Sequence, residues 1–362
     1  MEKLDVNPIP YLTWTWLKIN NDSVNYDFTL AENGGKEIEV PEGVKISAGK
    51  SVSTQLPGPE NSIGEQAATL IADAAAQGKI YTIEKSTGDK PLIIRIALDS
   101  NSASHQIIHA KAGVEAKVIV VYEGPSLRQA QDKLGSGIAG ATILSGVITK
   151  IYAEDDAQLH ISKVQLCDSN VNQIDDTAVV CGERAKVTLT QIELGGSHID
   201  AGFHATLQGY QSAFYSDTAY ICQGTQYLDM NQVVVHKGQK TVCDMKTHGT
   251  AKDESTKTYR GTIDMRTGCS GSVGNEIETT LLLSPNALVK AAPIILCGED
   301  DIAAEHGSTI GKLSDEMLFY MNTRGIDQKT AEELLTRAKV TAAASNIEDE
   351  EIQKEISDFL TR

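Results

Sequence analysis

Residues 276–327 read EIETTLLLSPNALVKAAPIILCGEDDIAAEHGSTIGKLSDEMLFYMNTRGID, and the rest of the chain is interpreted outward from this stretch. Its first part contains short apolar runs, at 281–283 and 293–296, separated by turn-forming residues, and these runs predict β-strands. Its second part changes to a helical pattern that begins at Ser314 and ends before Gly325. His306 lies where the β region gives way to the helical one, between a carboxylate and a glycine. That position is the first candidate for chemistry.

Upstream, from about residue 103, short segments with alternating apolar residues recur between Gly, Asn and Asp. Examples are 116–122 (AKVIVVY), 157–166 (AQLHISKVQL), 185–194 (AKVTLTQIEL) and 213–221 (AFYSDTAYI). No helical pattern of convincing length interrupts them. Strands at such intervals predict either a β-sandwich or a β-solenoid, and the residues alone leave both open.

Residues 1–100 predict a small mixed α/β region. Ser62 and Glu65 form a capping-box pattern, and the apolar spacing that follows predicts a helix over 63–77. Residues 91–97 (PLIIRIA) predict a buried strand.

The last residues, 313–362, predict a helical domain. One short helix is expected over 314–322, a second one capped by Asp327, and a third one after Asn346. A helical tail on a β body is either an interaction module or a cap that packs on its own solenoid, and the residues alone favour neither.

Composition excludes several classes of protein. The 362 residues are 41% hydrophobic but only 5% aromatic, which predicts a large core of aliphatic side chains. The formal net charge of −17 argues against a nucleic-acid partner. No apolar run approaches 18 residues, so no membrane span is expected, and the absence of a GxxxxGK[ST] loop predicts that no nucleotide is bound directly. The first residues lack a signal-peptide pattern, and we therefore expect a cytoplasmic protein.

The cysteines are scattered and form no CxxC pair. In a cytoplasmic chain this pattern predicts reduced, buried thiols that act as small hydrophobes, without a disulfide framework. The six are Cys167, Cys181, Cys222, Cys243, Cys269 and Cys297.

Four segments resemble the SufB/SufD family, the β-helical subunits of the SUF iron–sulfur cluster assembly machinery. The longest is HGSTIGKLSDEMLFYMNTRGI at 306–326, which is similar to the family pattern HGATxGxxDEExxFYLxSRGI. The others are TLLLSPNA at 280–287, PIILCGEDDIAAEH at 293–306, and Tyr-Arg-Gly at 259–261. Weaker similarity extends back to about the first third of the chain.

This resemblance implies a mainly β fold, a right-handed parallel β-helix over 101–312, between the mixed region at 1–100 and the helical domain at 313–362. It also implies a non-enzymatic subunit of SUF assembly, without catalytic residues. The β-helix would pair with a SufB-type partner or with a second copy of itself, and the C-terminal helices would dock a SufC-type ABC ATPase. The residues expected to contact that ATPase are Phe319, Tyr320, Arg324, Leu334 and Leu335.

The resemblance further implies that a transient iron–sulfur cluster or iron binds near His306. An isolated His in a β-rich chain is more often a structural residue, but the family motif favours a ligand, and Glu305 beside it adds a hard oxygen donor. The cluster-accepting Cys of SufB-like members lies 28 residues before the motif His, where this chain has Glu278. A SufD-like Cys two residues before that His is replaced by Ala304. Cys297 is the nearby thiol, and we include it as a candidate metal ligand.

Two other functions remain open. In the first, the chain would be a purely structural SufD-like subunit that binds no iron, and the absence of both family cysteines favours this function. Alternatively, it is a β-helical carbohydrate-active enzyme, which the few aromatic residues disfavour; Asp155-Asp156 would be its acid–base pair, although acidic turns are far commoner than catalytic dyads.

Overall fold

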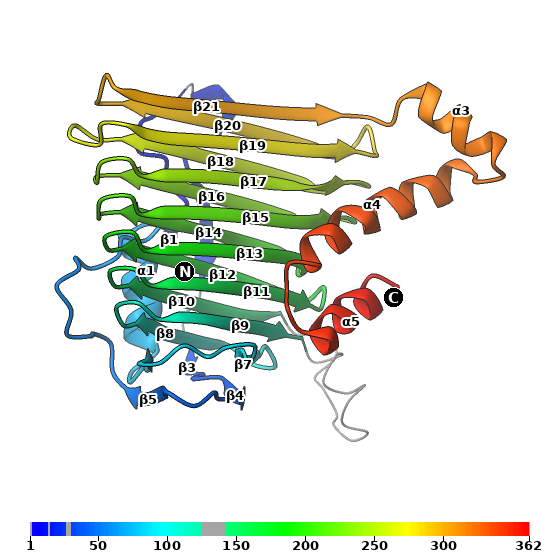
Figure 1. The fold of residues 1–362 in the computed structure, drawn as a ribbon. Helices are drawn as coiled ribbons and strands as arrows, with labels where there is room; N and C mark the ends of the chain where they lie inside the picture. Colours follow the sequence, from blue (N-terminus) through cyan, green and yellow to red (C-terminus); the bar gives the residue numbers. More distant parts are fainter. Residues whose placement is uncertain (1, 14, 27–29, 125–141, 362) are drawn as a thin grey trace.

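The computed structural model describes residues 2–13, 15–26, 30–124 and 142–361. It is mainly β, with 51% strand and 14% helix, and its strands form a parallel β-solenoid of about seven turns (Figure 1). This confirms the fold class and resolves the choice between sandwich and solenoid, because the strands of a sandwich pair antiparallel.

Two long sheets make up the solenoid. The first sheet contains β5 (Val44–Ala48), β6 (Lys79–Ile83), β8 (Ser102–Ala110), β10 (Ile143–Ala153), β12 (Val171–Cys181), β14 (His198–Leu207), β16 (Tyr227–His236), β18 (Thr256–Met265) and β20 (Leu288–Cys297), with the short β3 (Ala31–Glu32) beside β8. The second sheet contains β4 (Lys36–Glu39), β7 (Leu92–Ala97), β9 (Glu115–Glu123), β11 (Gln158–Cys167), β13 (Lys186–Gly195), β15 (Ala213–Cys222), β17 (Val242–Ala251), β19 (Ser272–Leu282) and β21 (Ile302–Gly311).

Each strand from β8 to β19 lies between two parallel neighbours of its own sheet, so the chain alternates between the sheets as it climbs. From β10 onward, residues paired on successive turns are between 26 (Asn172 with His198) and 32 (Thr256 with Leu288) positions apart. This variation explains why the sequence shows no fixed period. Strands β4 to β7, which precede residue 100, already belong to the two sheets.

Stacked turns connect the first sheet to the second. In six successive turns a residue with a left-handed conformation donates its N–H to a carbonyl of the next turn; these residues are Gly113, Asp156, Arg184, Gln211, Lys240 and Gly271. That conformation costs a non-glycine residue of the order of 1 kcal/mol, and the repeated backbone bond offsets the cost. The non-glycine residues in this stack are Asp156, Arg184, Gln211 and Lys240.

The outer face of the first sheet is covered by the N-terminal region. A hairpin of β1 (Glu2–Val6) and β2 (Asp22–Tyr26), joined through the short 3₁₀ helix η1 (Thr15–Leu17), packs there with α1 (Glu65–Ala74). The helix is shorter than the predicted 63–77, and the predicted capping box at Ser62 is wrong. Gly64 is the N-cap without a side-chain bond, because the Ser62 hydroxyl donates instead to the buried carboxylate of Asp176.

The C-terminal helices cover part of the outer face of the second sheet. They are α3 (Asp315–Thr323), α4 (Gln328–Ala344) and α5 (Glu350–Phe359). The end of α4 and the apolar side of α5 pack on β7, β9, β11, β13 and β15, whereas α3 and the start of α4 project away from the strands (Figure 1). Packing on the solenoid is thus limited to α5 and the end of α4, and an interaction module in the rest of the tail stays a prediction. In the part of the chain that the structure describes, no helix is long and apolar enough to cross a membrane.

Candidate functional site at the open end of the solenoid

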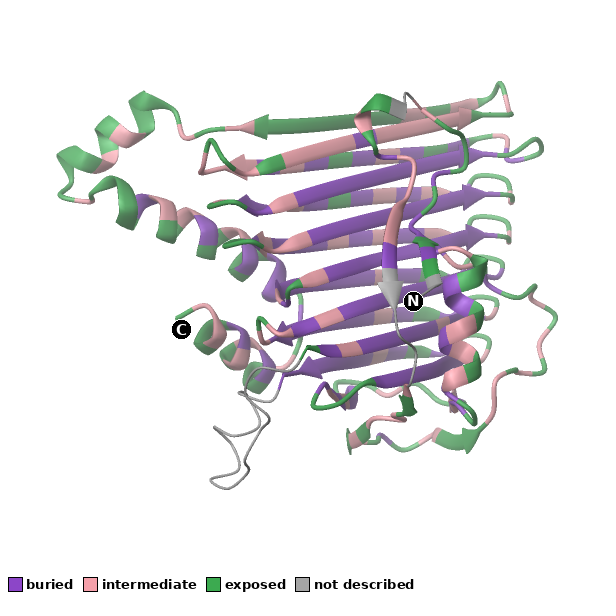
Figure 2. Cartoon of the chain, turned by 180° about the vertical axis from the view of Figure 1, so that it is seen from behind, coloured by how far each residue is buried: buried purple, intermediate pink, exposed green. Residues whose placement is uncertain are grey.

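The last two strands, β20 and β21, end the two sheets. Among the described strands each hydrogen-bonds to a single neighbour, so the outer edge of each presents free backbone donors and acceptors. Burial falls toward this end: the inner turns are mostly buried, whereas nearly every residue of β21 is exposed or half-buried (Figure 2). His306 lies in the middle of β21 and is exposed.

The strand geometry separates His306 from Glu305. Successive side chains of a strand point to opposite faces, so these two cannot ligate one ion from within β21. His306 pairs with Glu276 of β19, and Glu276 faces the solenoid interior. Glu276 and Glu278 both lie on the face of the imidazole, whereas Glu305 lies on the opposite face, and Glu276 is the one paired directly with His306.

The buried carboxylate of Glu276 lies beside the Tyr259 hydroxyl, the hydrogen-bond donor that faces it. Burial raises its pKa to about 7, and the negative charge of Glu278 adds to the shift. Its carboxylate lies against Gly261, where a Cβ atom would come within 1.9 Å of Oε1. The glycine of the Tyr-Arg-Gly motif is thus explained by the room that Glu276 needs.

The other two motif residues point to opposite faces. Tyr259 is buried inside the solenoid, and burial together with the nearby Glu276 charge raises its pKa well above the usual value. Arg260 points outward and holds the N-terminal region, because its Nε donates to the carbonyl of Ile19 and its guanidinium pairs with Asp229.

Glu278 is already engaged. Its Oε1 lies 2.6 Å from the Lys257 ammonium and accepts from the Thr280 hydroxyl, and its Oε2 accepts from the Ser308 hydroxyl at 2.6 Å. Both charged side chains are fully buried, and burial lowers the pKa of Lys257. Glu278 pairs in the ladder with Ser308, not His306. A metal ion would have to displace Lys257 to reach this carboxylate.

The structure does not bring Cys297 to His306. Cys297 ends β20 at the turn, whereas His306 lies four residues into β21, about 13 Å along a strand. Cys297 is exposed because no further turn covers it, so the expectation of six buried thiols is wrong for this cysteine and right for the other five. Ala304, at the other family Cys position, packs against the core.

The groups at the open end could bind a metal ion and pair with a strand of another chain. An exposed imidazole stands next to the buried Glu276 carboxylate, on a strand whose outer edge is free of other described strands. Imidazole and carboxylate together suit iron and other borderline cations, and a free edge suits pairing with a strand of another chain.

The predicted docking residues lie on the projecting part of the tail. Phe319 and Tyr320 are 71% and 56% exposed, and Leu334 is 48% exposed. The Arg324 guanidinium lies 5.2 Å from the centre of the Tyr320 ring, while Leu335 is half-buried. The described side chains of α3 include none that is buried, so its apolar residues face solvent.

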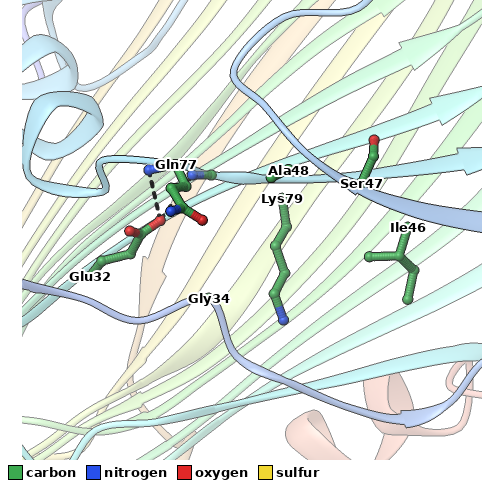
Figure 3. A pocket seen from close by; sticks show the side chains of 8 residues that line it. Glu32, Gly34, Ile46, Ser47, Ala48, Gln77 and Lys79 are labelled. Atoms are coloured by element: carbon green, nitrogen blue, oxygen red, sulfur yellow. Dashed lines mark hydrogen bonds between the residues drawn. The ribbon is translucent and has the colours of Figure 1, made fainter.

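Other candidates are accounted for within the fold. Asp155 and Asp156 lie in an exposed turn, where Asp155 accepts from the Glu183 N–H and Asp156 pairs with Arg184 at 2.6 Å. At the far end of the solenoid, a hollow of about 380 Å³ is lined by residues of β5 and β6 (Figure 3). The Glu32 carboxylate there accepts the N–H groups of Gln77 and Gly78, which gives it a structural role.

Comparison with known proteins identifies the chain's relatives. A family model described as "SUF system FeS cluster assembly, SufBD core domain" matches residues 94–339. Similar proteins include the iron–sulfur cluster assembly protein SufD of Bacillus subtilis, 26% identical over 42% of this chain and 36% of the relative. SufD of Escherichia coli is 22% identical over 55% of this chain and 48% of its own. The chloroplastic SufBD family protein ABCI8 of Arabidopsis thaliana is 24% identical over 52% and 35%. The chain thus spans about a third to a half of the length of these relatives.

Proposed function

Because the SufBD core-domain model covers well over half of the chain, the protein belongs to that family of the SUF system for iron–sulfur cluster assembly, and we propose that it acts as a non-enzymatic subunit of such an assembly complex. The observation that carries the proposal is the position of His306. The family-motif histidine is exposed on the last strand of the solenoid, beside the buried Glu276 carboxylate.

The open end of the solenoid is the proposed pairing surface. The free edges of β20 and β21 offer unpaired backbone groups to a strand of a SufB-type partner or of a second copy. Four exposed apolar side chains lie on the last three strands, β19 to β21, and would be buried on pairing. They are Val273, Ile277, Leu288 and Ile310.

In this proposal His306 holds iron or a nascent cluster as cargo, and Glu276 supports it from β19. Iron–sulfur clusters favour thiolate ligands. Since Glu278 and Ala304 stand at the two family Cys positions, further ligands would come from the partner across the interface or from Cys297. Glu305, on the opposite face of β21, would act from a different side of the strand.

The projecting α3 and the start of α4 are the proposed dock for a SufC-type ABC ATPase. Phe319, Tyr320 and Leu334 expose large apolar groups on a segment with little packing against the solenoid, and Arg324 adds a cation beside them. Exposed apolar groups of this kind are common at interaction sites. The cellular compartment stays a prediction, and the name of one relative places that relative in the chloroplast.

Replacement of His306 in cells tests the proposal. His306→Ala is expected to abolish maturation of a reporter iron–sulfur enzyme while protein level and thermal unfolding stay unchanged, because the side chain is exposed. His160→Ala is the matched control, a histidine on β11 of the same sheet, away from the open end. Full maturation with His306→Ala would contradict the site assignment.

A second candidate function is a structural subunit that binds no iron. The observation in its favour is the complete engagement of Glu278 by Lys257, Thr280 and Ser308 at the position of the family's cluster-accepting Cys. In that case His306→Ala leaves maturation intact, whereas removal of residues 313–362 abolishes it by releasing the ATPase.

A further inference from the structure

A second polar cluster lies on the outer face of the first sheet, under the N-terminal hairpin and separate from the open end. It joins Asp22 of β2 to His198 and Asp200 of β14. His198 and Asp200 are two residues apart on one strand and so share a face, while Asp22 arrives from 176 residues away. One ligand atom from each of the three lies within 4.8 Å of the others. In the described ranges this is the one group of three such side chains brought so close.

The three ligand atoms are held in place by their surroundings. His198 Nε2 lies 2.9 Å from Asp22 Oδ2 and 3.4 Å from Asp200 Oδ2. The His198 ring stacks on Tyr227 of β16, with 4.5 Å between ring centres, and the Tyr227 hydroxyl donates to Asp22 Oδ1 at 3.3 Å. The imidazole therefore has a fixed orientation toward both carboxylates.

Asp200 is the observation that points to a ligand. Its side chain is fully buried, neither carboxylate oxygen accepts a hydrogen bond of ordinary geometry from the residues that the structure describes, and Oδ2 lies 3.4 Å from His198 Nε2. A buried carboxylate normally has such bonds or a cation, because burial without them is costly. Asp200 also lies next to Asp229 on the neighbouring strand, and Arg260 is paired with Asp229. The cluster thus gathers the carboxylates of Asp22, Asp200 and Asp229 around the His198 imidazole and the Arg260 guanidinium.

We propose that Asp22, His198 and Asp200 form a binding site for one divalent first-row transition-metal ion. One imidazole nitrogen and two carboxylates suit Fe²⁺, Mn²⁺, Co²⁺ or Zn²⁺ and leave room for water in the coordination sphere. Asp22 and His198 are 14% and 28% exposed, which gives the ion a path in, while Asp200 forms the floor. The ion links the N-terminal hairpin to the middle of the solenoid.

Titration of the untagged full chain with Co²⁺, followed by its visible absorbance, tests the site. One ion per chain is expected, with affinity reduced at least tenfold by Asp200→Asn or His198→Gln. His248→Gln is the matched control, since His248 pairs with Asp217 at 2.8 Å without a third ligand. His306→Ala is expected to keep the ion, which separates this site from the open end. No saturable binding by the natural chain, or unchanged binding by both ligand variants, overturns the proposal.

Amide hydrogen exchange of the natural chain, with and without metal, tests the site in a second way. Zn²⁺ at a hundred times its dissociation constant is expected to slow amide exchange in the hairpin, residues 2–13 and 15–26, and in β14 of the natural chain. In Asp200→Asn, verified as folded by circular dichroism, the same Zn²⁺ concentration is expected to slow exchange in both segments about tenfold less, or less still. Equal slowing in the natural chain and this variant, or no slowing in the natural chain, contradicts a metal ion that joins the two segments.

Discussion

Two glutamates two residues apart on β19 point to the same interior, yet their environments are opposite. Glu278 pairs with Lys257 and accepts hydrogen bonds from two hydroxyls, whereas Glu276 has no cationic partner among the described residues and lies against the backbone of Gly261. The Lys257–Glu278 ion pair leaves neither charge buried alone, and loss of either residue would destabilise the fold. The environment of Glu276 keeps a carboxylate with a raised pKa beside the exposed His306. The proposed ligand environment and the buried ion pair thus lie two residues apart on one strand.

The raised pKa of Glu276 predicts a pH-dependent effect of Glu276→Gln. The folded chain holds the Glu276 proton up to a pKa of about 7, whereas the unfolded chain releases it near 4.5. The stability associated with the neutral acid is therefore complete below pH 4.5 and is lost as the pH rises through 7. Glu276→Gln is expected to raise the free energy of unfolding at pH 8 by about 3 kcal/mol and to change it little at pH 4. Urea unfolding at both pH values measures this.

The control for that experiment is Glu305→Gln, an exposed glutamate on the adjacent strand. Equal effects of Glu276→Gln at pH 4 and pH 8 would contradict the described environment of Glu276.

Loss of Lys257 is expected to be severe. Lys257→Met leaves Glu278 buried with hydroxyl partners only and is predicted to lower the free energy of unfolding by about 3–5 kcal/mol. Lys45→Met is the matched control, because Lys45 pairs with Glu84 at an exposed site, where such pairs contribute about 1 kcal/mol or less. Chemical denaturation of both variants decides the point, and similar losses would refute the burial argument.

Among the secondary-structure elements, the C-terminal helices form two parts that differ in how far they are buried. The apolar side of α5 and the end of α4 pack on the second sheet, with Ile352 and Ile356 almost fully buried. The described residues of α3 include no buried side chain. Packing thus fixes the base of the tail to the solenoid and leaves the tip available to a partner.

This division predicts opposite results for two truncations in the tail. Ile356→Ala is expected to lower the free energy of unfolding by about 2–5 kcal/mol, because it leaves a cavity under α5. Phe319→Ala is expected to change it by about 0.5 kcal/mol or less and instead to weaken capture of the ATPase subunit. Thermal unfolding combined with a pull-down from the same preparations measures both. Full ATPase capture by Phe319→Ala would place the dock elsewhere.

Over the whole molecule, the sequence predicted the local elements but not the contacts between neighbouring turns of the solenoid. Local alternation identified the four strands quoted from 116–221 nearly to the residue, and the cap at Asp327 identified the start of α4, because these signals lie within a few neighbouring residues. The solenoid followed from the motif at 306–326. Residues on neighbouring turns lie 26 to 32 positions apart from β10 onward, so no local pattern pairs Glu276 with His306 or Asp22 with His198. For the same reason Glu278 was predicted as a ligand although Lys257 already occupies it.

At the open end of the whole solenoid, His306 is proposed to face iron and sulfide at an interface with a partner. The most direct measurement is anaerobic reconstitution with iron and sulfide of the complex isolated from cells, carrying either the natural chain or His306→Ala. We expect cluster absorbance and bound iron in the natural complex. We expect both to be lost in the His306→Ala complex while the partners remain bound. Equal cluster content in the two complexes would contradict this role of His306.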